Sequence, residues 1–142
     1  MGMSKMLKIT FVVDGTPVPK GRPRFSLGHV YTPKRTREFE AKVRDAAKAA
    51  MRGRPATDMP VRVSIHAYRE IPKSWSKKKQ ERARHAEILP SSHGMDIDNV
   101  YKSVLDGMIS TVYTDDCQVV ELAGVKAYSG YARTEVQVME IG

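Results

Sequence analysis

Alternation of apolar and polar residues with a period of two is the sequence feature that most constrains the fold. Residues 8–14 place Ile9, Phe11 and Val13 on one side, and residues 61–68 alternate in the same way. Because successive side chains of a strand point to opposite faces, each stretch predicts a strand with one face in the core. Two further strands are predicted over residues 118–128 and 133–141.

Apolar residues at helical spacing separate these strands. The spacing predicts a helix over residues 37–52 with Thr36 as its N-cap. It also predicts a second helix that is capped by Asp98 or Asn99 and runs to about residue 110. Together with the strands, this order predicts an α/β fold: a single compact domain over all 142 residues, with a mixed β-sheet flanked by helices.

The chain is strongly basic, with 24 Lys and Arg against 16 Asp and Glu, a net charge of +8 and a pI of about 9.7. This balance is typical of nucleic-acid-binding proteins, although charge alone identifies no partner. Positive charge gathers in a loop over residues 16–35, where Pro, Gly and Phe interrupt it, and in a short, partly helical arm over residues 75–86. We expect the loop to bind phosphates, whereas the arm could equally be a solvated surface. The predicted DNA-binding residues are Lys20, Arg22, Arg24, Lys77, Lys78 and Lys79.

An acidic island interrupts this basic chain over residues 95–118. Its five aspartates are Asp96, Asp98, Asp106, Asp115 and Asp116. Carboxylates held close together raise one another's pKa unless a cation lies between them, so the island is a candidate site for Mg²⁺ or Mn²⁺.

The expected geometry depends on local structure. If residues 95–98 are extended, Asp96 and Asp98 point to the same side, and Lys102 follows one helical turn later. Only one member of the Asp115–Asp116 pair is expected to face them. Taken one at a time, the same residues could instead be a helix cap, a surface ion pair and a solvated turn.

Other site chemistries find little support. Cys117 is the only cysteine, which excludes a disulfide within the chain and a multi-cysteine zinc site. The four histidines lack the spacing of zinc ligands. No apolar run is long enough to span a membrane, and the N-terminus lacks the apolar core of a signal peptide, so we expect a cytoplasmic protein without a membrane partner.

The order of residues in the acidic island is specific. It runs Asp96-Ile97-Asp98-Asn99, then Lys102, Leu105-Asp106, Asp115-Asp116 and Gln118-Val119. This order resembles the signature of the RusA family of Holliday junction resolvases. The resemblance extends to residues 17–25, residues 72–79 and Lys126, which are similar to phage and prophage members, and so covers nearly the whole chain.

The resemblance implies a homodimeric, Mg²⁺-dependent endodeoxyribonuclease that cuts paired strands of four-way DNA junctions. Carried over by position, Asp96, Asp98 and Asp116 match the family's essential aspartates, and Lys102 matches its catalytic lysine. Asp115 is the alternative metal ligand to Asp116.

The resulting hypothesis is a metal-dependent nuclease in which Mg²⁺, or Mn²⁺ as a substitute, activates water against a phosphodiester of branched DNA. Two alternatives stay open: a non-catalytic basic DNA-binding protein, and a nuclease for flaps, forks or RNA. The aromatic residues Phe25, Tyr31 and Trp75 are similarly ambiguous, because each could stack on bases or pack in the core.

Overall fold

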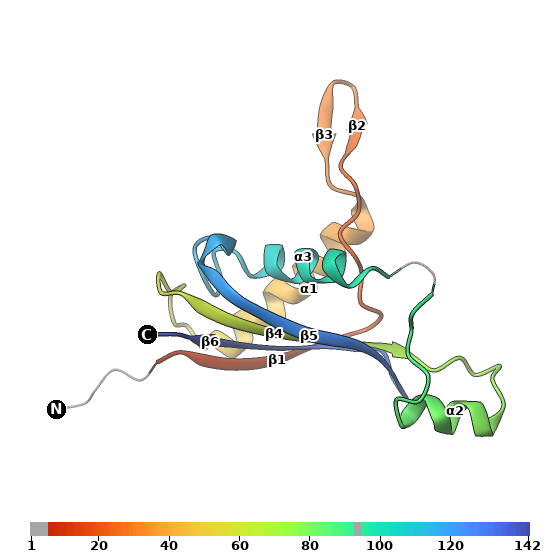
Figure 1. The fold of residues 1–142 in the computed structure, drawn as a ribbon. Coiled ribbons are helices and arrows are strands. Elements are labelled where there is room, and N and C mark those ends of the chain that lie inside the picture. The colour runs from red at the N-terminus through yellow and green to blue at the C-terminus, as the bar shows by residue number, and fades with distance from the viewer. Residues whose placement is uncertain (1–5, 93–94) are drawn as a thin grey trace.

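The computed structural model describes residues 6–92 and 95–142 and shows a four-stranded sheet with its two longer helices on one face (Figure 1). The strand order is β1-β6-β4-β5. These strands are β1 (Lys8–Asp14), β4 (Val61–Glu70), β5 (Val119–Ser129) and β6 (Arg133–Glu140). The helices are α1 (Lys34–Met51), α2 (Lys77–Arg84) and α3 (Ile97–Met108). The predicted α/β fold with a mixed sheet is therefore confirmed.

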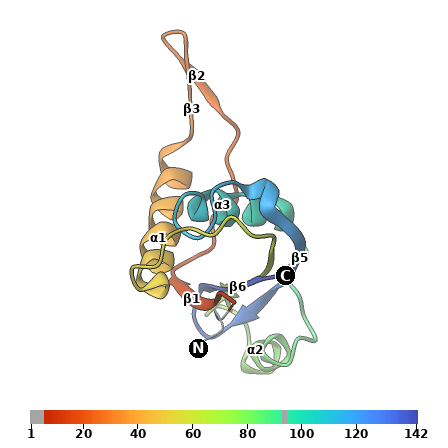
Figure 2. The same cartoon turned by 90° about the vertical axis from the view of Figure 1, so that its left-hand side faces the viewer.

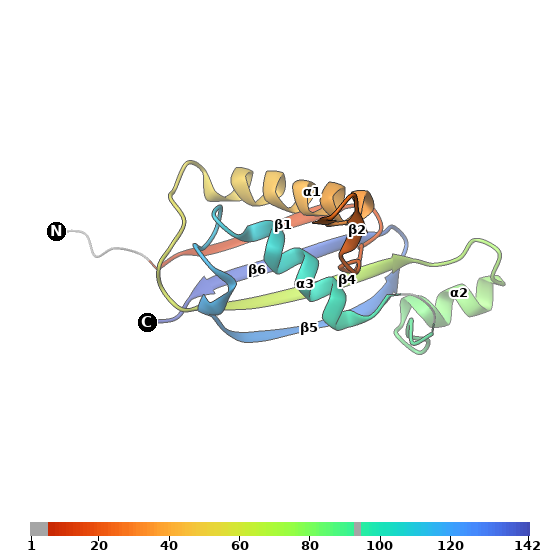
Figure 3. The ribbon, with the colours of Figure 1, turned by 90° about the horizontal axis from the view of Figure 1, so that it is seen from above.

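The pairing of the strands determines where α3 lies. β6 pairs antiparallel with both β1 and β4, whereas β4 and β5 run parallel. Parallel neighbours cannot be joined by a tight turn and need a crossover, which here contains α2 and α3. Seen from above, α1 and α3 both lie along the sheet (Figure 3). The acidic island is thus placed on the helical face.

The core lies between the sheet and these two helices. Alternate residues of β1 and β4, such as Phe11 and Ile65, meet the apolar sides of the helices, including Val43 on α1 and Val104 on α3. All four are at least 93% buried, as the period-two and helical patterns predict. Among the described residues, no helix is long and apolar enough to cross a membrane.

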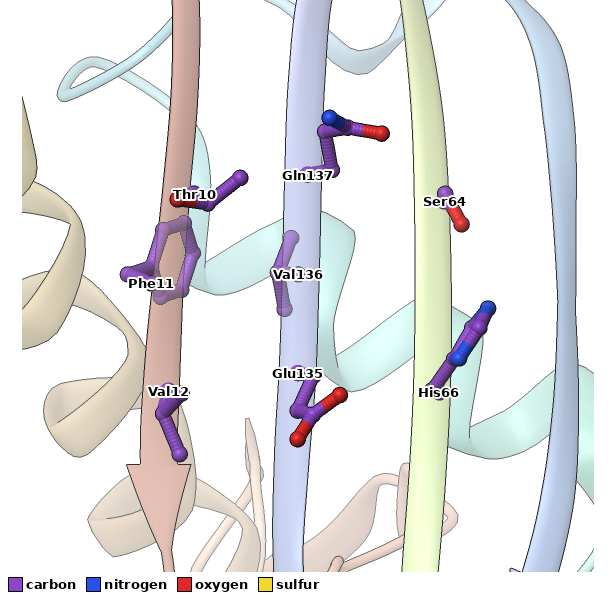
Figure 4. Close-up of a pocket in the computed structure, with 8 residues that line it drawn as sticks. All are labelled: Thr10, Phe11, Val12, Ser64, His66, Glu135, Val136 and Gln137. Carbon is purple, nitrogen blue, oxygen red and sulfur yellow. The ribbon is translucent and has the colours of Figure 1, made fainter.

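The opposite face of the sheet is covered by neither α1 nor α3 (Figures 1 and 2). Figure 4 shows its side chains, which surround a shallow hollow. Those on the uncovered side are Thr10, Val12, Ser64, His66, Glu135 and Gln137. Because α3 packs on the other face, this hollow is not part of the acidic site.

Both predicted helix caps are wrong. α1 begins at Lys34 after Pro33, and Thr36 is buried inside the helix, where its Oγ1 accepts a hydrogen bond from the Gly21 N–H (3.1 Å). α3 begins at Ile97, with Asp96 at the N-cap position. Asp98 therefore lies in the first helical turn, so the prediction that residues 95–98 are extended fails at Ile97 and Asp98.

The basic loop contains a β-hairpin that the sequence did not predict. β2 (Arg24–Ser26) pairs with β3 (His29–Tyr31), and the two views in Figures 1 and 2 show the hairpin extending away from the sheet. Its turn is Leu27-Gly28, both with positive φ (50° and 79°). A leucine at the first of these positions is uncommon, which explains why the turn went unrecognised. The expected helical arm is confirmed as α2, whose Ser76 cap accepts from the Lys79 N–H.

Two predictions fall partly outside the described residues. The predicted loop over residues 90–94 includes 93–94, and the segment judged to lack a signal peptide includes 1–5.

Gly107 sets the distance between α1 and α3. A Cβ at this position would lie 2.8 Å from Val43 Cβ and 3.0 Å from the Glu40 carbonyl oxygen. We expect Gly107→Ala to lower the free energy of unfolding by about 1–3 kcal/mol through overpacking, measured by urea denaturation. Gly130→Ala, where nothing lies within 4 Å, should change it by less than about 0.5 kcal/mol. Equal effects of the two variants would contradict this packing.

Candidate active site

The exposed side of α3 carries a row of charged residues. Asp98, Lys102 and Asp106 follow one another at intervals of four, while Val100 and Val104 on the opposite side are fully buried. Residues four apart are neighbours on a helix surface, so these three charges share one stripe. Burial of the apolar side thus determines which way the charged residues face.

Lys102 links this stripe to the second half of the acidic island. Its Nζ lies 3.0 Å from Asp106 Oδ1 and 3.4 Å from Asp116 Oδ2. Hydrogen bonding to Asp106, reinforced by Asp116, outweighs partial burial and raises the pKa of Lys102 above its ordinary value. The ammonium group is therefore charged at neutral pH and holds two carboxylates near one another.

Asp115 and Asp116 have different surroundings. The Asp115 carboxylate accepts a hydrogen bond from the Cys117 N–H (3.0 Å), and the Gln118 side chain accepts one from the Asp115 N–H. These reciprocal bonds form a capping box for the short 3₁₀ helix η1 (Asp116–Gln118). The hydrogen bond from Cys117 lowers the pKa of Asp115. Of the adjacent pair, Asp116 is the member that contacts Lys102.

Asp106 joins this end of α3 to α1 and to the basic loop. Its second oxygen, Oδ2, lies 3.0 Å from Lys20 Nζ, which also contacts Glu40 Oε2 at 2.7 Å. Burial alone would lower the pKa of Lys20, but hydrogen bonds to Glu40 and Asp106 raise it overall. The result is a continuous ion-pair chain of Glu40, Lys20, Asp106, Lys102 and Asp116. Sequence reasoning missed Glu40, because a single glutamate on an amphipathic helix gives no sign of such a role.

Hydrogen bonds also fix the backbone on both sides of Asp96. The Lys20 N–H donates to the Asn99 carbonyl (2.7 Å), and the Ser103 hydroxyl donates to the Val18 carbonyl (2.6 Å). From β5, Lys126 Nζ donates to the Met95 carbonyl (2.7 Å). The first two contacts attach the basic loop to the first turns of α3, and the third attaches β5 to the residue before Asp96.

Asp96 and Asp98 keep their carboxylates available. Asp96 stands at the N-cap without using its side chain as a cap, and both residues are exposed. Within residues 6–92 and 95–142, neither carboxylate forms a hydrogen bond or an ion pair. Asp96 also lines a hollow with Arg22, Arg24 and Arg35 from the basic loop. An anion held in this hollow would lie beside an unpaired carboxylate.

Tyr113 lies buried beneath the acidic residues. Its hydroxyl donates to the Leu105 carbonyl (2.6 Å). Burial raises the pKa of Tyr113 strongly, and the negative charges of Asp116, Asp106 and Asp115 raise it further. The phenol therefore stays protonated at neutral pH.

The donor set fits a divalent ion that is shared with a substrate. In the described part of the chain, no three Asp, Glu, His or Cys side chains form a group that could hold a metal ion by themselves. Mg²⁺, however, is usually held by one or two carboxylates together with substrate phosphates and water. Asp96 and Asp98 supply two carboxylates that have no other partner among the described residues, and these residues form no closed protein cage.

The predicted DNA-binding residues fall into three groups. Arg22 and Arg24 are exposed near Asp96. Lys20 instead has its ammonium between two carboxylates, which favours a structural role. The lysines of α2 are exposed, but α2 lies below the level of the sheet whereas the hairpin projects above it (Figure 1). There Lys79 Nζ lies 4.1 Å from the ring centroid of Trp75, which in turn packs against Tyr128.

Comparison with known proteins decides the classification. The family described as Endodeoxyribonuclease RusA matches residues 14–139. The chain belongs to the RusA family. It is also 38% identical over 141 residues to the uncharacterized protein YqaN of Bacillus subtilis (strain 168), covering 94% of this chain and 96% of YqaN. The resemblance found in the sequence is confirmed, and membership of the RusA family indicates an endodeoxyribonuclease.

The ion-pair chain can be tested through its central lysine. Lys20→Met leaves Glu40 and Asp106 facing each other in a site where their side chains are only 18% and 17% exposed. We expect it to lower the free energy of unfolding by about 1–3 kcal/mol in urea denaturation. The control is Lys34→Met, which removes the exposed pair with Glu38 and should cost less than about 1 kcal/mol.

The same comparison has a predicted pH dependence. A raised pKa means that Lys20 stabilises the folded state fully below its ordinary pKa of 10.5, and that this contribution is lost as pH rises through the folded-state pKa. The stability difference between wild type and Lys20→Met should thus be constant near neutral pH and shrink above pH 10.5. A difference that grows in alkali would contradict the assignment.

Proposed function

We propose that this RusA-family endodeoxyribonuclease resolves four-way DNA junctions by metal-dependent hydrolysis, acting as a homodimer in the cytoplasm. The observation that carries the proposal is that Asp96 and Asp98 have no partner among the described residues, on the helix where Lys102 contacts Asp116. The net charge of +8 on the chain supports a polyanionic substrate.

Asp96, Asp98 and Asp116 are the proposed metal ligands, with Mg²⁺ as the natural ion and Mn²⁺ as a substitute. When bound, such an ion supplies Lewis-acid activation of water and of the scissile phosphate. Asp116 is favoured over Asp115 as third ligand because the Asp115 carboxylate already caps η1. Asp116 contacts an ammonium group that a metal ion can replace.

Lys102 is proposed to donate hydrogen bonds to the phosphate as negative charge develops on it. Donors that are already oriented contribute most to stabilising a transition state, because they need no reorganisation. Asp106 provides that orientation, since it holds the Lys102 ammonium at 3.0 Å and is itself held by Lys20. Asp106 and Lys20 are therefore positioning residues.

DNA binding is assigned to the exposed cations. Arg22 and Arg24 would contact phosphates next to Asp96, and Lys77, Lys78 and Lys79 would contact a more distant part of the same DNA. Cutting two opposed strands of one junction requires two sites related by symmetry, which a homodimer supplies.

Substitution of the carboxylates tests the chemistry. We expect Asp98→Asn and Asp96→Asn each to slow Mg²⁺-dependent cutting of a synthetic four-way junction by about 10²-fold or more, because each removes a charged metal ligand. Binding of the junction should be retained or tightened, since a negative charge near phosphate is lost. Rates are measured under single-turnover conditions on labelled strands.

Asp45→Asn is the matched control, because Asp45 is exposed on α1 outside the proposed site, and its rate should stay within about twofold of wild type. Uncut junction with wild-type protein and Mg²⁺ would favour a non-catalytic DNA-binding protein. Preferential cutting of flaps or forks in the same panel would reassign the substrate.

Salt dependence tests the DNA-binding residues separately. Arg22→Ala and Arg24→Ala should each reduce the slope of log affinity against log salt by about one unit. Lys48→Ala, an exposed change in the last turn of α1, should leave the slope unchanged. Slopes are measured by fluorescence anisotropy with Ca²⁺ in place of Mg²⁺. Equal slopes for all four proteins would contradict binding through the basic loop.

A further inference from the structure

The β2–β3 hairpin exposes apolar side chains that the body of the protein does not use. Phe25 is 78% exposed, Leu27 at the turn is 97% exposed and Val30 is 59% exposed. Figures 1 and 2 show the hairpin extending away from both the sheet and the helices. Grouped apolar side chains on a projecting element mark a binding surface rather than a folding requirement.

The hairpin has two chemically different faces. Residues directly opposite each other in an antiparallel pair share a face. Phe25 pairs with Val30, which makes one face apolar. Arg24 pairs with Tyr31 and Ser26 with His29, which makes the other face polar and basic. A ligand that combines negative charge with flat apolar surfaces would match both.

The base of the hairpin is tied to the candidate active site. The Gly21 N–H donates to Thr36 Oγ1, and a Cβ on Gly21 would lie 2.9 Å from Pro33 Cγ, so the two ends of the hairpin segment are held close together. Arg22 and Arg24 line the same hollow as Asp96. The base of the hairpin therefore lies next to the site where the scissile phosphate is proposed to bind.

The charge of the hairpin segment favours nucleic acid as its ligand. Residues 15–37 include no Asp or Glu, whereas they include six Lys and Arg. Such a segment repels another copy of itself and attracts a polyanion. Apolar side chains of a DNA-binding element contact bases where stacking is interrupted, as it is at a branch point.

We infer that the hairpin enters the branch point of the DNA, where Phe25 and Leu27 contact unstacked bases while the Arg24 and His29 face contacts phosphates. This inference rests on the proposed function, which it deepens by naming the element that holds the junction open beside the active site. The cations hold the DNA at the hairpin, and the apolar face keeps the central bases apart.

The test uses a four-way junction with 2-aminopurine at the branch point, bound in the presence of Ca²⁺ so that no strand is cut. Wild-type protein should change the fluorescence of this base relative to free junction. The double variant Phe25→Ala, Leu27→Ala should lose at least two thirds of that change, and Phe25→Trp should retain it. Leu89→Ala is the matched control, because Leu89 is 55% exposed in the segment after α2, and it should behave as wild type.

The rate of junction cleavage is the second measurement. On an intact junction the double variant should cut at least tenfold more slowly than wild type, whereas on a junction with mismatched bases at its centre the two rates should agree within threefold. An equal fluorescence change for wild type and double variant, or conversion of a dimer to a monomer by the double variant, would overturn the inference. Absence of cutting by wild type would instead reject the proposed function, and the fluorescence result would still decide the role of the hairpin.

Discussion

The carboxylate of Asp106 is the contact on which the arrangement of the site depends. One oxygen accepts from Lys102 on its own helix, and the other accepts from Lys20 in the basic loop. Through Lys20 it reaches Glu40 on α1, and through Lys102 it reaches Asp116 at the start of η1. Four segments far apart in the sequence thus meet around one residue. Because its side chain is only 17% exposed, water screens these contacts less than it screens surface ion pairs.

The fold and the site follow from the same constraint. The parallel pairing of β4 with β5 requires a crossover, and α3 is the part of that crossover that packs on the sheet. Its buried side meets α1 closely at Gly107, so its charged side has a fixed direction. At the N-terminal end, the carboxylates of Asp96 and Asp98 have no partner within residues 6–92 and 95–142, and Asp96 lines a hollow with the arginines of the basic loop. The fold thus holds Asp106 between two cations, whereas none of the described cations contacts Asp96 or Asp98.

Periodicity predicted the four strands of the sheet and the main helices, because burial of one face determines both patterns. Sequence-based prediction was wrong at helix caps and at a turn, where a single local contact determines the structure. Thr36 has the chemistry of a cap but is buried as an acceptor for Gly21, and Asp96 takes the cap position expected of Asp98 or Asn99. The hairpin went unrecognised because Leu27 is unusual in its turn. The contact of Lys20 with Glu40 and Asp106 joins positions that local patterns do not connect, so no reading of spacing could have predicted it.

The central claim is that Asp96 and Asp98 bind a divalent ion together with a DNA phosphate, next to Lys102. The most direct measurement is anomalous diffraction from a crystal of the wild-type protein with Mn²⁺ and a four-way junction whose scissile phosphates resist hydrolysis. The account predicts an anomalous peak in contact with both carboxylates and with a phosphate oxygen. A peak bound elsewhere, with Asp96 and Asp98 still without a cation, would contradict it.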